Sequence, residues 1–185
     1  MSRYSIWILL ACVGLLCVGH GLQGSLVAVV AQASDFGPDV TGLVMSGYAA
    51  GLLVSSYITP RLVRSVGHVR AFAGLASIVS TAVLLMPLWI NAPFWLAMRF
   101  VAGLCTSGLF IVCESWLNGA SSNRNRGQIL SMYMVVTYGA LGAGQLLLNV
   151  ADSSGFSRFI IASALLSLSL VPLIAFGFAI LKGMG

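Results

Sequence analysis

The chain has 185 residues, of which 59% are hydrophobic and only 7% are charged, and its formal net charge is +5. Soluble domains carry about 25% charged residues, because a charged surface has to cover the apolar core. This composition therefore argues against a soluble domain and predicts an integral membrane protein. The nine Lys and Arg residues are scattered between apolar runs and make no continuous basic patch, which argues against nucleic-acid binding. The four cysteines also lie in apolar runs, where we expect small buried residues instead of disulfides or metal ligands.

Six apolar stretches are each long enough to cross a bilayer as a helix, which takes about 20 residues. In chain order we expect spans at residues 5–31, 40–59, 70–90, 94–117, 127–150 and 158–181. Turn-forming residues separate them at 35–39, 91–93 and 152–155, and a polar basic loop covers 121–127. The first apolar run exceeds the core of a signal peptide, about 7–15 residues, so we interpret it as a transmembrane helix. The pattern predicts an all-α membrane protein with one six-helix bundle over residues 1–185.

The basic residues of the loops indicate an orientation, because Lys and Arg are enriched on the cytoplasmic side of membrane proteins. With the N-terminus inside, the basic residues on the cytoplasmic side are Arg3, Arg61, Arg64, Arg70, Arg124, Arg126 and Lys182. Only Arg158 lies in an external loop, where the other charged residues are Asp35, Asp39 and Asp152. We therefore expect both termini in the cytoplasm, and for a bacterial protein this places the bundle in the inner membrane.

Residues 47–70 read GYAAGLLVSSYITPRLVRSVGHVR, a glycine-spaced helix followed by a short basic loop centred on a glycine. This stretch resembles the signature loop between helices 2 and 3 of the major facilitator superfamily. Gly67 matches the central glycine of that loop, and His68 and Arg70 match its basic tail. Arg64 stands where the family has an aspartate, so the helix-capping and gate-latching acid of the family is missing here.

A second match lies in the fourth span, where residues 99–103 read RFVAG and look like the R-x-x-x-G motif of the same family. The run from Arg99 to Leu148 resembles a branch of bacterial permeases in which an acid ends helix 4, an Asn/Arg loop follows and helix 5 carries a Gly-Gln pair. The matching residues are Glu114, Arg124, Arg126, Gly127, Gly144 and Gln145. The glycines of the family's antiporter signature are present in helix 5 without its proline, so the resemblance to antiporters is weak.

The resemblance covers the whole chain but only the first half of a family whose members have about twelve helices. It implies two inverted three-helix repeats in this bundle, with a solute site near the middle of the membrane between this half and a second one.

Two charged residues lie within the spans, Arg99 and Glu114, and charges there usually face a cavity or a partner. Arg99 is a candidate anchor for an anionic group or a proton-coupling residue in the cavity; the alternative is that it extends to the outer headgroups. Glu114 is a candidate for a cytoplasmic gate latch with Arg61, Arg64 or Arg124; the alternative is a static interfacial ion pair. The candidate gate comprises Glu114, Arg61, Arg64, Gly67, Arg70 and Arg124.

His20 in the first span lies at about the depth of Arg99, and in this family helices 1 and 4 both line the cavity. A histidine titrates near neutral pH and could carry a coupling proton, or it could only hydrogen-bond a helix backbone. Gln23 lies one turn from His20 on the same face and is a candidate for binding polar groups of the solute. Most helix glycines, including Gly47, Gly51, Gly139, Gly142 and Gly144, are expected at close helix contacts.

The expected function is secondary transport of a small solute across the membrane by alternating access, coupled to protons. No catalytic triad, phosphate-binding loop or metal motif is present, so we expect neither an enzyme nor a cofactor. The expected partners are the lipid bilayer, the solute, and a second six-helix half or another membrane subunit. The alternative is a non-transporting membrane subunit that scaffolds or helps assemble a larger complex.

Overall fold

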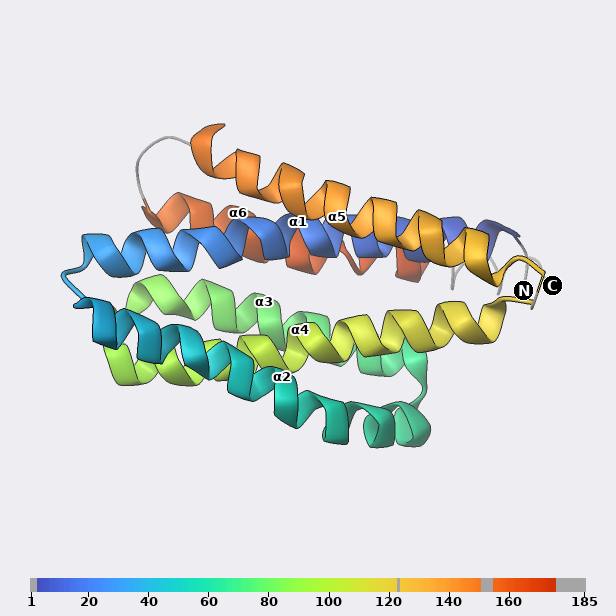
Figure 1. The fold of residues 1–185 in the computed structure, drawn as a ribbon, viewed down its shortest axis with the longest axis horizontal. Coiled ribbons are helices and arrows are strands. Elements are labelled where there is room, and N and C mark those ends of the chain that lie inside the picture. The colour runs from blue at the N-terminus through green and yellow to red at the C-terminus, as the bar shows by residue number, and fades with distance from the viewer. Residues whose placement is uncertain (1–2, 123, 151–154, 176–185) are drawn as a thin grey trace.

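The computed structural model describes residues 3–122, 124–150 and 155–175, and in this part of the chain the only regular structure is helical. The elements are α1 (Arg3–Ala33), α2 (Pro38–Val66), α3 (His68–Leu85), the short 3₁₀ turn η1 (Met86–Leu88), α4 (Ala92–Ala120), α5 (Arg126–Val150) and α6 (Gly155–Leu168). The helices run side by side as an elongated bundle (Figure 1). Within the described residues, six helical segments are long and apolar enough to cross a membrane, and the sixth of them, Phe156–Ala175, extends beyond α6. The fold class predicted from the sequence is confirmed.

Local sequence explains where several helices begin and end. The side chain of Asn91 accepts a hydrogen bond from the backbone N–H of Phe94, and Pro93 occupies the first turn of α4, as expected for a helix start. Gly67 ends α2 with φ of +83°, a left-handed conformation that favours glycine and lets the chain turn directly into α3. Helix α2 continues to Val66 although the apolar run expected as its span stops at residue 59. Apolarity marks the part inside the membrane, whereas the helix itself continues through its polar last turns.

The helices pack in two matching groups. Helix α1 packs against α5 and α6, and helix α4 packs against α2 and α3. In Figure 1 the helices α1, α5 and α6 accordingly lie on one side of the bundle, and α4, α2 and α3 lie on the other. Contact between α3 and α6 joins the two groups. Each helix of the first three thus has the contacts of its counterpart in the last three, which is the arrangement of two inverted repeats.

Glycines create the same close crossing in both groups. In the α2–α4 crossing, a Cβ on Gly51 would meet the carbonyl oxygen of Phe100, and a Cβ on Gly103 would meet that of Tyr48. Such contacts leave no room for any side chain, so the two backbones approach as closely as the glycines allow. Gly47 fits against Leu96 in the same crossing, as expected for a packing glycine.

The α1–α5 crossing repeats these contacts. A Cβ on Gly144 would meet the carbonyl oxygen of Val18, and a Cβ on Gly21 would meet that of Leu141. Of the three glycines expected to pack from α5, only Gly144 does so, since Gly139 and Gly142 have nothing within 4 Å of a Cβ. Residues two positions apart on a helix lie about 200° apart around its axis, so Gly142 and Gly144 could not face the same neighbour.

The contact between α3 and α6 is polar. Ser80 donates from its hydroxyl to the carbonyl oxygen of Ser163 over 2.9 Å, and Ser163 donates back to the carbonyl oxygen of Ser80 over 3.0 Å. This reciprocal pair is buried and satisfies both hydroxyls between the two outer helices of the repeats.

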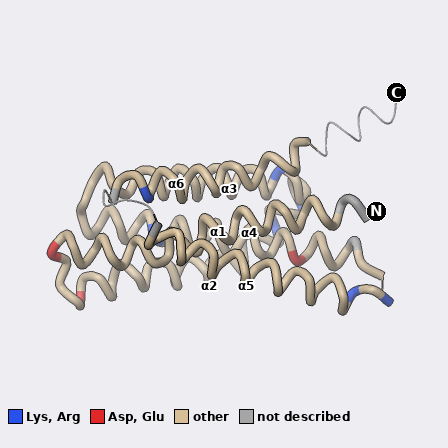
Figure 2. The backbone as a smooth tube through the Cα atoms, turned by 90° about the horizontal axis from the view of Figure 1, so that it is seen from above, with Lys and Arg blue, Asp and Glu red and all other residues tan. Residues whose placement is uncertain are grey.

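The charged positions lie mostly toward the ends of the bundle. Figure 2 shows blue basic positions gathered near the end that holds the α4–α5 loop, and two red acidic positions at the opposite end. The α2–α3 loop is at the same end as the α4–α5 loop, because the helices alternate in direction. The long middle of the bundle carries few charges, which makes the exceptions informative.

Candidate functional site

A cluster of polar side chains lies in the middle of the bundle, where α1, α2 and α4 meet. The hydroxyl of Tyr48 on α2 lies 3.3 Å from Nε2 of His20 on α1, and the two rings stack with centroids 5.8 Å apart. The guanidinium carbon of Arg99 on α4 lies 4.5 Å from the centroid of the same Tyr48 ring. Arg99 and His20, which were both singled out in the sequence, thus both contact the side chain of Tyr48.

Tyr48 itself was missed by the sequence analysis. It lies in the glycine-spaced stretch of α2, next to Gly47, and its backbone sits directly against Gly103 of α4. That contact fixes where the Tyr48 side chain begins, and the side chain then reaches between α1 and α4. A polar aromatic residue inside an apolar helix was the available signal, but its direction depends on the helix crossing.

Burial separates this cluster from ordinary interface residues. Arg99 is 4% exposed and Gln23 is 0% exposed, so neither side chain extends along lipid to the headgroups. Several buried polar atoms in this region have no hydrogen-bond partner among the described residues. They are Nδ1 of His20, both amide atoms of Gln23, Nε and Nη1 of Arg99, and the hydroxyl of Thr106.

Unpartnered buried polar atoms are rare, because each one costs about 1–3 kcal/mol and a charged group costs more. A stable protein keeps such groups only where a ligand, water or another protein surface completes them. The apolar neighbours of the cluster add to this effect: Phe110 packs its ring edge-on against His20, with centroids 6.2 Å apart. The cluster is therefore a set of donors and acceptors held in an apolar surround.

A second polar group lies at the end of the bundle that holds the α2–α3 loop. Nε2 of His68, at the start of α3, lies 3.2 Å from the hydroxyl of Ser115 on α4, and the His68 ring also contacts Trp116. These contacts hold the α2–α3 loop with Gly67 close to α4. A pocket of about 410 Å³ lies here between Pro60, Val63, Arg64, His68, Ile111 and Ser115.

Glu114 has a different partner from the arginine expected. Its carboxylate accepts a hydrogen bond of 3.1 Å from the hydroxyl of Tyr133 on α5, a buried residue that the sequence analysis did not single out. Among the described residues no ion pair joins Glu114 to Arg61, Arg64 or Arg124. In this structure a tyrosine hydrogen bond, and not the expected ion pair, holds the Glu114 carboxylate.

The arginines expected at the cytoplasmic gate lie at the surface. Arg61 donates from Nη1 to the carbonyl oxygen of Tyr57 over 2.6 Å, within its own helix. Arg64 lines the pocket beside His68, and Arg70 and Arg124 are exposed. Arg126 donates from Nε to the side chain of Asn118 over 3.0 Å and so joins the two ends of the α4–α5 loop.

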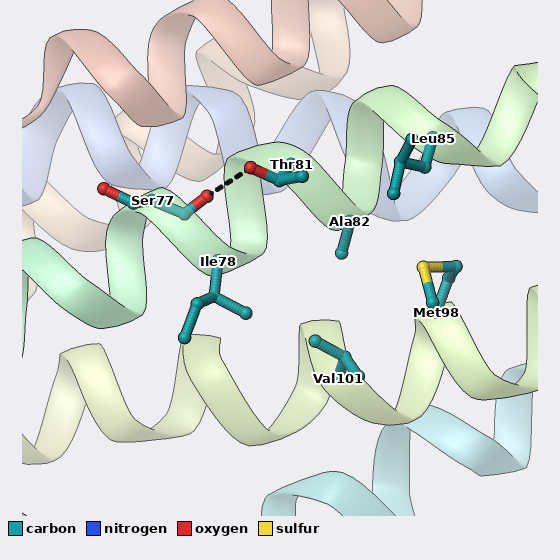
Figure 3. Close-up of a pocket in the computed structure, with 7 residues that line it drawn as sticks. All are labelled: Ser77, Ile78, Thr81, Ala82, Leu85, Met98 and Val101. Atoms are coloured by element: carbon teal, nitrogen blue, oxygen red, sulfur yellow. Dashed lines mark hydrogen bonds between the residues drawn. The ribbon is translucent and has the colours of Figure 1, made fainter.

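A groove on the outer surface of α3 and α4 differs from both polar groups (Figure 3). Its volume is about 320 Å³, and it is lined by Ser77, Ile78, Thr81, Ala82, Leu85, Met98 and Val101. The hydroxyl of Thr81 donates to the carbonyl oxygen of Ser77 over 2.9 Å, so it is already satisfied within α3. The lining is otherwise apolar, which suits contact with lipid chains and not a polar solute.

The fold and the buried polar cluster define a multi-pass membrane bundle built from inverted three-helix repeats around a charged centre. The chain belongs to the Major Facilitator Superfamily, whose family model matches residues 9–182. It is 31% identical over 176 residues to an uncharacterized MFS-type transporter, YE1530, of Yersinia enterocolitica, which covers 94% of this chain and 46% of that protein. It is 31% identical over 177 residues to the uncharacterized MFS-type transporter YcaD of Escherichia fergusonii, with the same coverage. The chain thus spans about half the length of the curated relatives it matches.

Proposed function

We propose that this chain is the N-terminal half of a secondary transporter that moves a small solute across the bacterial inner membrane by alternating access, coupled to protons. The observation that carries the proposal is Arg99, which is 4% exposed, contacts Tyr48 and has unpartnered Nε and Nη1 atoms. Membership of the Major Facilitator Superfamily supports it, because transport is what the curated relatives are named for. The proposal assigns no catalytic step and no cofactor to the chain.

The residues divide into a central site and an inner gate. In the central site Arg99 holds the solute or the coupling group, His20 exchanges the coupling proton, and Gln23 binds a polar group of the solute. At the inner end the pocket beside Arg64 and His68 changes shape as the two halves rock, and the Glu114 contact to Tyr133 opens and closes with it. Alternating access in this fold consists of rocking one bundle against another around a fixed midplane site.

A second six-helix bundle has to complete the site. Helices α2 and α5 are the least buried of the six and expose large apolar side chains along most of their lengths. On α2 these include Leu53 and Tyr57, and on α5 they include Val135, Tyr138 and Leu146. We propose that the second bundle, either the other half of the same protein or another chain, packs on these two helices.

The test is solute-evoked proton movement into liposomes that contain a trapped pH-sensitive dye. The chain is reconstituted alone and together with the second half of the Yersinia enterocolitica relative, and pools of small solutes are added outside. We expect proton entry only with both bundles present, and none when Arg99→Gln replaces the wild type. Transport by the chain alone would overturn the need for a second bundle. A stable assembly that moves no solute would favour the non-transporting subunit.

Orientation has its own test, in a variant without native cysteines. The proposed cytoplasmic position of the α4–α5 loop predicts that Ser122→Cys reacts with an impermeant thiol reagent only after cells are opened. Asp35→Cys, in the α1–α2 turn at the opposite end of the bundle, is the matched control and should react in intact cells. Labelling of Ser122→Cys from outside would reverse the proposed orientation.

A further inference from the structure

The charge of Arg99 has no counter-ion in the part of the chain that the structure describes. Arg99 and Glu114 are the charged residues well inside the helices, and they are separated by roughly 22 Å along α4, given a rise of 1.5 Å per residue. Glu114 already accepts the hydroxyl of Tyr133. The remaining acids of the described helices and turns, Asp35 and Asp39, lie at the outer end of the bundle. A buried guanidinium without an anion is unfavourable, so binding of a negatively charged group at this site is favoured.

Tyr48 contacts the guanidinium group of Arg99 on its face only. Its ring takes the flat face of Arg99 at 4.5 Å, a contact that stabilises a desolvated cation without using any N–H group. The donors in the plane of the guanidinium therefore stay available, and Nε and Nη1 have no partner among the described residues. Nε and Nη1 point to different sides of the guanidinium group, so each can donate a separate charge-assisted hydrogen bond to an anion.

The neighbouring groups supply neutral donors and acceptors. The amide of Gln23 offers both, Nδ1 of His20 is open while its Nε2 is engaged by Tyr48, and the Thr106 hydroxyl is unpartnered. These side chains match a solute that carries a hydroxyl or similar polar group beside its negative charge. They do not supply a second fixed positive charge, so the site as described balances a single negative charge.

We infer that the solute is a small organic anion whose carboxylate accepts a charge-assisted hydrogen bond from an unpartnered nitrogen of Arg99, and that Tyr48 is the positioning residue that holds the guanidinium by its face. The inference rests on the proposed transport function, because it calls the bound anion the solute. Anion binding itself can be measured without transport. The other source of an anion is an acidic side chain of the second bundle, and the experiment below separates the two.

The test follows the Nε–H signal of Arg99 by nitrogen-15 NMR of the whole chain in lipid nanodiscs, with the signal assigned by its absence in Arg99→Lys. The probes are acetate, lactate, succinate and inorganic phosphate, with acetamide and lactamide as neutral counterparts of the first two. We expect a saturable shift with lactate, a weaker one with acetate, and none with either amide. Equal shifts with lactate and lactamide, or no shift with any of the four anions, would overturn the inference.

Two substitutions of Tyr48 separate positioning from a general structural role. Tyr48→Phe keeps the ring and should keep lactate affinity within about twofold, whereas Tyr48→Leu removes the ring and should weaken it about tenfold or more. Equal weakening by both variants would contradict the role of the ring face. If Tyr48→Leu does not fold, the titration of the wild type and of Tyr48→Phe still decides the inference.

The same titration in the two-bundle assembly identifies the source of the anion. The Arg99 signal could shift when the two bundles assemble and then stay unchanged on addition of every free anion. In that case a carboxylate of the second bundle is the counter-ion and the inference is wrong. Lactate binding without solute-evoked proton movement would leave the inference standing and defeat the transport proposal. Transport of neutral solutes without anion binding would support the transport proposal and overturn the inference.

Discussion

The two glycine crossings of the bundle share their backbone geometry and differ in their chemistry. Gly51 and Gly103 bring α2 against α4, and Gly144 and Gly21 bring α5 against α1 through the same backbone atoms. In each crossing one helix carries a residue that meets the partner's glycine and, three positions later, a glycine of its own. These residues are Phe100 and Gly103 on α4, and Val18 and Gly21 on α1. The positions of the two crossings can therefore be matched one by one.

The matched positions show which side chains differ between the two crossings. Arg99 precedes Phe100, and its counterpart is Cys17, which precedes Val18. Tyr48, which contacts Gly103, corresponds to Leu141, which contacts Gly21. One crossing thus carries a cation on an aromatic ring, and the other carries a thiol and a leucine. Glycine packing is common to both repeats and is structural, whereas Arg99 and Tyr48 depart from the repeat and are the residues that we assign to function.

The largest effect is expected from breaking the crossings themselves. Gly51→Ala and Gly144→Ala each place a methyl group where a carbonyl oxygen lies, so the helices must separate along their length. We expect each to lower the unfolding free energy by about 3 kcal/mol, the upper range for overpacking a core. The measurement is unfolding in mixed micelles by added denaturing detergent, followed by circular dichroism.

Gly139→Ala is the matched control for those substitutions, because it lies on the same helix as Gly144 with open space around it. It should raise stability by about 0.5–1 kcal/mol, the usual gain from alanine in a helix interior. If Gly144→Ala proves as harmless as Gly139→Ala, the α1–α5 crossing is not the equivalent of the α2–α4 crossing.

The second prediction concerns the charge that distinguishes the crossings. Arg99→Met removes a buried unpaired charge and keeps most of the side-chain volume, so the chain alone should become more stable by about 1–3 kcal/mol while binding of lactate is lost. Cys17→Ala at the matching position should cost about 1 kcal/mol and leave binding unchanged. A loss of stability in Arg99→Met would mean that Arg99 has a structural partner.

Hydropathy predicted the helix number, because it depends on which residues fall inside an apolar run. Charge placement singled out Arg99, and the structure places Arg99 and His20 against Tyr48, but their role in a site stays a proposal. Arg99 and His20 could be matched in depth from helix length alone. What they touch could not be predicted, because Tyr48 reaches them through the angle at which α2 crosses α4. The same limit explains Gly139, since counting glycines says nothing about how a helix is rotated.

The partner of Glu114 was mispredicted for an energetic reason. Opposite charges in the sequence suggested an ion pair, but Arg61 and Arg124 are exposed, and an exposed ion pair contributes little to stability. Tyr133 is already buried beside Glu114, and its hydroxyl needs an acceptor. At a membrane surface the neutral donor that is already desolvated is the better partner.

The third prediction tests the contact that joins the two groups of helices. Ser80→Ala removes the hydrogen bond from the Ser80 hydroxyl to the carbonyl oxygen of Ser163, keeps the backbone carbonyl that accepts from Ser163, and should lower stability by about 0.6–1.7 kcal/mol, the range for such bonds between membrane helices. Ser163→Ala should cost the same, because the pair is reciprocal. The double variant should lose about the sum of the two, because each hydroxyl donates to a backbone carbonyl that alanine retains, and a double variant no worse than either single one would show that the two hydroxyls act as one unit.

The smallest effect on stability is expected near the α4–α5 loop, where Glu114 meets Tyr133. Tyr133→Phe removes the hydroxyl that Glu114 accepts, and because Glu114 is exposed, water can take its place. The unfolding free energy should therefore fall by about 0.5–1 kcal/mol. Glu114→Gln keeps an acceptor for the hydroxyl and should change stability less. If the contact serves the gate, both variants alter the rate of solute-evoked proton movement in the two-bundle assembly while lactate affinity at Arg99 stays within about twofold, since the two sites are roughly 22 Å apart along α4. A change in lactate affinity with an unchanged transport rate would place Tyr133 and Glu114 in the central site instead of the gate.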